Sequence, residues 1–269
     1  HPLPPSLPPP LSIPALRRLS FRQNLLADAS PLNGLACAPL LEELVLHDNK
    51  LATIPALPAL GALTRLELSY NCLSSLAPLA ALAPATPLRE LYAAANAVTR
   101  IEGLAGVLPG LAVLELGSNA LPALEGLAGA GALTALCLGR NRIPAIPPAS
   151  LAGLASLRVL ALPSNRLTSM DALGAGHTPA LEELYLSHNG ICALAGLGAL
   201  PNLKVLDVAA NRVSDVADLA SAPPLTDLWL NDNRIVSLGA LATALRAGRA
   251  GGSITCAYLA GNPAVEALK

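Results

Sequence analysis

The sequence is poor in aromatic and charged residues. Aromatic side chains make up 2% of the 269 residues, charged side chains make up 13%, and the formal net charge is −1. A compact core of this size would normally contain more Phe and Trp, so the composition favours a fold filled by aliphatic side chains. A near-neutral chain has no global attraction for nucleic acid or an anionic membrane, and we expect neither as a partner.

Cysteine is also scarce, and its pattern excludes a disulfide framework. The five cysteines are an odd number, and the chain contains no C-x-x-C pair and no N-x-S/T glycosylation sequon. This usage favours a reducing compartment. We therefore expect an intracellular protein of the nucleus or cytoplasm, with the cilium as a further location. Most of the cysteines are interpreted as small core residues.

Targeting and membrane-spanning segments are not predicted. The opening residues, HPLPPSLPPPLSIP, have no charged region followed by an apolar one, so they do not read as a signal peptide. The apolar stretches 68–88 and 184–203 are interrupted by Pro, Asn or Ser. Neither is expected to cross a membrane.

What the sequence does contain is a repeated phrase, L-x-x-L-x-L-x-x-N, as in LTRLELSYN, LAVLELGSN and LEELYLSHN. The closing asparagines recur every 22 to 25 residues, with one stride of 29 before the last. We call them the asparagine ladder: Asn24, Asn49, Asn71, Asn96, Asn119, Asn141, Asn165, Asn189, Asn211, Asn233 and Asn262. This wording at this spacing is the signature of leucine-rich repeats.

Each phrase alternates apolar and variable residues, which is typical of a short strand with one buried face. Identical strands one repeat apart must pair in parallel, about 4.8 Å apart. The rest of each repeat contains Pro and Gly, which favours short 3₁₀ or extended segments over long helices. The predicted fold is an α/β leucine-rich-repeat solenoid (a horseshoe) with a concave parallel β-sheet and short 3₁₀ or irregular convex segments.

We expect residues 1–269 to form a single domain of about eleven repeats, with a proline-rich, degenerate first repeat at 1–15 and a C-terminal cap truncated after 263. The stretches APATP (83–87) and LRAGRAGGS (245–253) are predicted to be exposed loops. Each ladder asparagine is expected to be buried and to bond backbone groups that would otherwise lack partners. Losing one such side chain should cost roughly 1–3 kcal/mol.

The residue between the paired leucines is predicted to project from the middle of the sheet. In chain order this outward row is Ser20, Val45, Glu67, Tyr92, Glu115, Cys137, Ala161, Tyr185, Asp207, Trp229 and Tyr258. A second row, two residues earlier, contains Glu43, Glu90, Glu183, Asp227 and the basic Arg65.

The outward row holds the only Trp and three of the four Tyr of the chain. Aromatic side chains interleaved with carboxylates suit a protein-binding face for a basic or mixed-charge partner. The alternative is a solvated sheet face on which strand propensity alone favours aromatics.

No catalytic, metal or cofactor site is predicted. His47 and His188 lie far apart in the repeat array and cannot share a metal ion. No nucleophile and base can be assembled on neighbouring repeats, and the glycine clusters at 129–132 and 174–176 do not open a phosphate-binding strand–helix unit. We therefore predict a protein that is not an enzyme.

The wording of individual repeats resembles the leucine-rich-repeat regulatory subunit of protein phosphatase 1. The phrases that carry the resemblance keep that family's order: LSFRQNLL (19–26), LEELYLSHNGI (181–191), LDVAANRV (206–213), LWLNDN (228–233) and YLAGNP (258–263). The sequence departs from the family at Cys137, where a larger side chain is usual, and in its enlarged spacing between Trp229 and Tyr258.

The resemblance implies a non-catalytic regulator whose concave face grips the phosphatase catalytic subunit. The residues that match the family's binding row are Glu67, Tyr92, Glu115, Asp207, Asp227, Trp229 and Tyr258, and the outward row adds Cys137 and Tyr185. The alternative hypothesis is a structural scaffold subunit of a large intracellular assembly, such as a ciliary or nuclear complex.

Overall fold

The structure is a computed structural model. It describes residues 13–28, 32, 38–55, 57, 60–82, 86–104, 108–248 and 252–268. The chain divides into two compact units. Unit 1 is His1–Leu121 with Gly126–Leu133, and unit 2 is Pro122–Glu125 with Thr134–Lys269. The single-domain organisation stays a prediction, and residues 1–12 of the expected first repeat lie outside the described residues.

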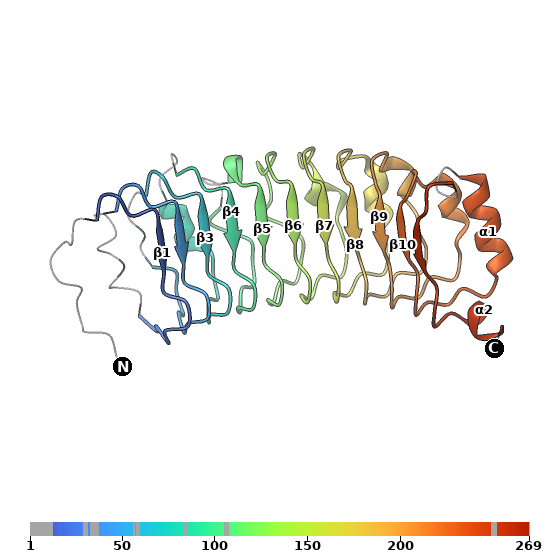
Figure 1. The fold of residues 1–269 in the computed structure, drawn as a ribbon, viewed down its shortest axis with the longest axis horizontal. Helices are drawn as coiled ribbons and strands as arrows, with labels where there is room; N and C mark the ends of the chain where they lie inside the picture. Colours follow the sequence, from blue (N-terminus) through green and yellow to red (C-terminus); the bar gives the residue numbers. More distant parts are fainter. Residues whose placement is uncertain are drawn as a thin grey trace. The chain divides into compact units, whose positions relative to one another are not determined.

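Unit 1 contains three-residue strands that pair in parallel and in chain order (Figure 1). They are β1 (Arg18–Ser20), β2 (Glu43–Val45), β3 (Arg65–Glu67), β4 (Glu90–Tyr92) and β5 (Val113–Glu115). The register aligns the central leucine of each strand with that of the next. Two short 3₁₀ helices, η2 (Ala77–Ala81) and η3 (Leu108–Gly110), lie in the connections.

Unit 2 repeats this plan. Its strands are β6 (Ala135–Cys137), β7 (Val159–Ala161), β8 (Glu183–Tyr185), β9 (Val205–Asp207), β10 (Asp227–Trp229) and β11 (Cys256–Tyr258). The connecting helices are η4 (Pro148–Leu151), η5 (Asp171–Ala175), η6 (Leu197–Ala199), η7 (Ala217–Ser221) and α1 (Leu238–Ala247), and α2 (Pro263–Glu266) follows the last strand. The prediction of a leucine-rich-repeat solenoid with a parallel sheet and short 3₁₀ segments is confirmed.

Alternation along each strand separates the core from the surface. The central leucines, such as Leu66 and Leu206, are fully buried. The first and third residues of each strand point the other way, because successive side chains in a strand face opposite sides. We call the surface made by these first and third residues the outer face of each unit.

The asparagine ladder closes each turn through hydrogen bonds. Asn211 is typical: its Oδ1 accepts from the Ile191 N–H at 3.0 Å, and its Nδ2 donates to the Leu186 and Val208 carbonyls at 3.0 Å. The residue before the asparagine has a positive φ, as at Ala210 (φ 52°), which turns the chain away from the sheet. The side chain thus supplies partners to backbone groups of two successive turns.

One member of the ladder differs from the rest. Asn24 is exposed, and its Nδ2 donates to the carbonyl of Arg22 at 3.0 Å. It lies in the first described turn. The expected burial is confirmed for six members of the ladder, whereas four others are only half-buried: Asn96, Asn119, Asn165 and Asn189.

The predicted loop at 245–253 is partly wrong, because α1 extends to Ala247. Ala and Leu dominate Leu238–Ala247, and both favour helix. Ser237 caps the helix, since its Oγ accepts from the Ala240 N–H at 3.1 Å. The helix accommodates the additional residues between Asn233 and Asn262, so Trp229 and Tyr258 still pair in register.

The exposed loop predicted at 83–87 is also wrong at one position. Thr86 is 7% exposed, whereas residues 83–85 lie outside the described part of the chain.

Candidate functional site

The predicted partner-binding residues lie on the outer faces of both units. Tyr185, Asp207, Trp229 and Tyr258 are third residues of strands in unit 2, as is Cys137, whereas Asp227 is the first residue of β10. Glu67, Tyr92 and Glu115 occupy third positions in unit 1. Whether they bind a partner stays a prediction.

The outer face of unit 2 carries a run of three aromatic rings. The centroids of Tyr185 and Trp229 are 6.4 Å apart, and those of Trp229 and Tyr258 are 5.9 Å apart, both with edge-to-face geometry. Such pairs contribute about 0.5–1.5 kcal/mol beyond the area they bury. The rings therefore form one preorganised surface, of which Tyr258 is 54% exposed.

Asp207 lies beneath this run of rings. In the sheet register its neighbours are Tyr185 on one side and Trp229 on the other, and only 5% of Asp207 is exposed. Its Oδ1 accepts from the Ala209 N–H at 2.9 Å. The row position predicted a projecting carboxylate, but the two large neighbours cover it.

The carboxylates of this face are held by hydroxyl groups. The Tyr185 hydroxyl donates to Glu183 at 2.9 Å, and the Thr226 hydroxyl donates to Asp227 at 2.8 Å. Burial, together with Glu183, Asp207 and Asp227, raises the pKa of Tyr185 from 10.0 to about 12. The first and third positions of β6–β11 contain no Lys or Arg, so this face is acidic.

Trp229 carries an unsatisfied donor. Its indole Nε1 is buried and has no hydrogen-bond partner among the residues that the structure describes. A buried N–H without an acceptor lowers stability.

The cysteines of the outer face differ in their surroundings. The Cys256 side chain, two residues earlier on the same strand, raises the pKa of the Tyr258 phenol. Cys137 is partly exposed and pairs in register with Ala161. Cys72 and Cys192 are exposed, so the prediction that most cysteines are core residues is wrong. Both follow ladder asparagines in the turns, outside the buried leucine positions.

The outer face of unit 1 is organised around Arg65. Its Nη1 donates to Glu90 Oε2 at 2.6 Å, and its Nε lies 3.2 Å from Glu43 Oε1 without hydrogen-bond geometry. The guanidinium carbon lies 4.5 Å from the centroid of the Tyr92 ring, and the Tyr92 hydroxyl donates to Glu90 at 3.0 Å. Two carboxylates and an aromatic ring therefore surround the Arg65 cation.

Three acidic residues of the outward row have a local structural role that their sequence positions did not reveal. Glu67 accepts from the Ser69 N–H at 2.8 Å, and Glu115 accepts from the Gly117 N–H at 2.6 Å. Asp207 does the same for Ala209. In each case the carboxylate bonds the backbone two residues ahead, so part of its hydrogen-bonding capacity is used within the chain.

An aromatic pair in unit 1 was not predicted from the sequence. The rings of His47 and Tyr70 lie 5.0 Å apart, Tyr70 is 58% exposed, and His47 Nδ1 is 3.8 Å from Glu67. Tyr70 is the one tyrosine outside the outward row. Its position outside that row was the signal in the sequence from which this pair could have been found.

The described residues contain neither a cluster of metal-binding side chains nor a membrane-spanning helix. No group of three or more His, Cys, Asp or Glu side chains is arranged there to hold a metal ion. None of the helices in these ranges has the length and apolar character needed to cross a bilayer.

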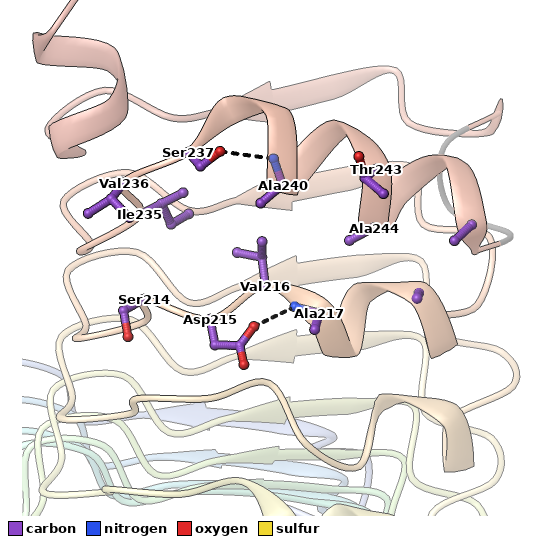
Figure 2. A pocket seen from close by; sticks show the side chains of 12 residues that line it. Ser214, Asp215, Val216, Ala217, Ile235, Val236, Ser237, Ala240, Thr243 and Ala244 are labelled. Carbon is purple, nitrogen blue, oxygen red and sulfur yellow. Dashed lines mark hydrogen bonds between the residues drawn. The ribbon is translucent and has the colours of Figure 1, made fainter.

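A groove of about 440 Å³ lies between η7 and α1 (Figure 2). Two of its polar side chains bond backbone N–H groups near the starts of these helices: Asp215 accepts from the Ala217 N–H at 2.9 Å, and Ser237 accepts from the Ala240 N–H. The rest of the lining is mainly small and apolar, as at Val216 and Ala244. No convergent set of polar groups marks it as a ligand site.

Comparison with known proteins identifies the repeats. Residues 131–191 match the family model described as leucine rich repeat, and residues 179–221 match the model for two copies of leucine rich repeats. The crystal structure of an internalin, inlF, from Listeria monocytogenes is similar with a TM-score of 0.70 and 22% identity, over 92% of this chain and 74% of the internalin. This likeness concerns the fold alone.

Two relatives match by sequence. A protein phosphatase 1 regulatory inhibitor subunit homologue of Arabidopsis thaliana is 42% identical over 193 residues, which are 71% of this chain and 56% of the relative. The alpha subunit of geranylgeranyl transferase type-2 of Bos taurus is 37% identical over 102 residues, 37% of this chain and 18% of that subunit. The chain thus spans just over half of the first relative. The resemblance carried by the repeat wording is confirmed.

Proposed function

Because the chain is a leucine-rich-repeat protein, we propose that it is a non-catalytic regulatory subunit that binds a protein phosphatase 1 catalytic subunit. The choice of partner rests on the relative that is 42% identical over 193 residues. An intracellular location, in the nucleus or cytoplasm, is part of the same proposal. Such a subunit would act by occupying surface and restricting access to the phosphatase.

The observation that carries the proposal is the outer face of unit 2. Trp229 lies between Tyr185 and Tyr258, the carboxylates of Glu183 and Asp227 flank the rings, and the first and third positions of β6–β11 contain no cation. Binding energy at protein interfaces concentrates on such Trp and Tyr anchors. The surrounding carboxylates favour a partner surface rich in Lys and Arg. In this proposal the face lies on the concave side of the sheet and meets a basic surface of the partner.

The test measures capture of the phosphatase catalytic subunit by the immobilised chain. Trp229→Ala combined with Tyr258→Ala should weaken the affinity at least about tenfold, because both rings belong to the aromatic run of this face. Tyr70→Ala is the matched control, since Tyr70 is an exposed aromatic outside the outward row. Equal capture by the double variant and the unmodified chain would refute this binding surface.

A second experiment tests the partner itself. Native co-purification followed by mass spectrometry should recover a stoichiometric phosphatase catalytic subunit. Recovery of structural proteins of a large assembly without the phosphatase would instead support the scaffold hypothesis.

A further inference from the structure

A line of arginines follows the asparagine ladder in unit 2. The residue after each of the ladder members Asn141, Asn165, Asn189, Asn211 and Asn233 is, in order, Arg142, Arg166, Gly190, Arg212 and Arg234. All four arginines are exposed. We call Arg142, Arg166, Arg212 and Arg234 the arginine edge.

Backbone hydrogen bonds stack this edge turn upon turn. The Arg166 N–H donates to the Ile143 carbonyl at 2.9 Å, and the Arg234 N–H donates to the Val213 carbonyl at 2.8 Å. Gly190 and Arg212 make the equivalent bonds, at 2.7 and 2.8 Å. Each residue of the edge thus lies beside its counterpart one turn earlier, at the spacing of parallel strands, about 4.8 Å.

The fold does not require arginine at this position. In unit 1 the same place after the ladder asparagine is occupied by Leu25, Lys50, Cys72, Ala97 and Ala120. The backbone N–H groups of Lys50, Cys72, Ala97 and Ala120 make the same bond, such as Ala97 to the Leu73 carbonyl at 2.8 Å. Only the backbone is used, so the side chain is free to serve another purpose.

The guanidinium groups of the edge have no ion pair with any carboxylate in the described ranges. By contrast, Arg65 and Arg158, both outside the edge, are paired with glutamates. Two acids close in sequence bond neutral groups of the chain: Asp215 accepts from the Ala217 N–H, and Asp232 accepts from Asn231 Nδ2 at 2.8 Å. Like charges on neighbouring turns repel one another, and no carboxylate in these ranges lies within ion-pair distance of the edge.

We propose that the arginine edge binds an extended acidic segment of a protein partner. A guanidinium presents a planar pair of donors that matches a carboxylate, so each arginine can engage one Glu or Asp side chain. Gly190 has no side chain and leaves a gap between Arg166 and Arg212, which are two turns or roughly 10 Å apart. In this proposal one acidic side chain of the partner lies in that gap, between the two guanidiniums. This surface is separate from the outer face and does not depend on the proposed phosphatase partner.

The charge distribution favours a peptide over nucleic acid or an anionic membrane. The edge is one side chain wide, which suits a single extended chain. On the outer face of the same unit, Glu183 and Asp227 would repel the phosphates of a broad polyanion. The net charge of −1 adds no general attraction for such a surface.

The test uses an immobilised peptide of alternating Glu and Ser and measures affinity by biolayer interferometry. Arg166→Ala with Arg212→Ala should lower the affinity at least about tenfold, because both guanidiniums beside the gap are lost. Alanine is the appropriate substitute, since Ala97 and Ala120 occupy this position in unit 1. An unchanged unfolding midpoint is expected for the same reason.

The matched control is Arg22→Ala with Arg246→Ala, which removes the same charge from exposed positions outside the edge. The affinity of this control variant for the peptide should stay within about twofold of that of the unmodified chain. Equal losses in both variants, or no binding by the unmodified chain, would overturn the proposal. Tighter binding to a single-stranded oligonucleotide or to phosphatidylserine vesicles than to the peptide would also overturn it.

Discussion

The outer faces of unit 1 and unit 2 stand on strands of the same length and register but balance their charges in different ways. In unit 1, Arg65 lies between Glu43 and Glu90 and over the ring of Tyr92. In unit 2 the first and third strand positions provide no cation. There the carboxylates are held by hydroxyl and backbone donors that leave their negative charge in place.

The comparison shows that the repeat fixes where a side chain points, whereas its neighbours decide whether it is available. Arg65 neutralises part of its own surroundings, so the unit 1 face keeps less net negative charge than the unit 2 face. The unit 2 face keeps both its negative charge and the exposed ring of Tyr258. A basic partner can therefore gain more from unit 2 than from unit 1.

The largest expected effect tests whether the scaffold itself differs between the units. Asn71 and Asn211 make equivalent bonds, with Oδ1 accepting at 3.0 Å and Nδ2 donating to three carbonyls. Asn71→Ala and Asn211→Ala should each lower the free energy of unfolding by roughly 1–3 kcal/mol, measured by urea denaturation. Asn24→Ala, at an exposed ladder position, is the control and should cost less. Clearly unequal losses at the two buried positions would mean that the faces differ because the scaffolds differ.

A smaller effect concerns proton binding on the unit 2 face. With a pKa near 12 in the folded state against 10.0 ordinarily, Tyr185 holds its proton more tightly when the chain is folded. Its contribution to stability should be complete below about pH 10 and be lost as the pH rises through about 12. A tyrosinate absorbance titration should show a final step that Tyr185→Phe removes and Glu183→Gln moves to lower pH. A final step that survives Tyr185→Phe would contradict this assignment.

The smallest effect converts the unit 1 face towards the character of unit 2. Arg65→Gln removes the cation between Glu43 and Glu90, yet should change the free energy of unfolding by no more than about 1 kcal/mol, because the pairs are partly solvated. Burial and Glu90 already raise the pKa of Tyr92, and Arg65 opposes that rise. The variant should therefore titrate Tyr92 at higher pH than the unmodified chain. An unchanged Tyr92 pKa would show that Arg65 does not balance this face.

Periodicity was sufficient to predict the strands and the ladder. The L-x-L pattern places Leu66 and Leu206 in the core, and the same alternation places Tyr185 and Trp229 on the outer face. These features depend on the backbone alone, which repeats from turn to turn. They could therefore be predicted from one sequence.

What could not be predicted depends on contacts between neighbouring side chains. Asp207 is buried because the residues on either side of it are Tyr185 and Trp229, which its own position in the row does not reveal. The segment 245–247 is helical because the preceding Ala and Leu residues favour helix more than the following glycines oppose it. In both cases sizes and propensities of adjacent residues override the repeat.

Trp229 gives the molecule a built-in optical reporter. It is the only tryptophan of the chain, and its ring lies between those of Tyr185 and Tyr258 on one face of one unit. Indole emission depends on polarity and on nearby groups, so a ligand that covers these rings should shift it, whereas a ligand on unit 1 should not. Occupancy of the unit 2 face can thus be followed by fluorescence in the unlabelled protein.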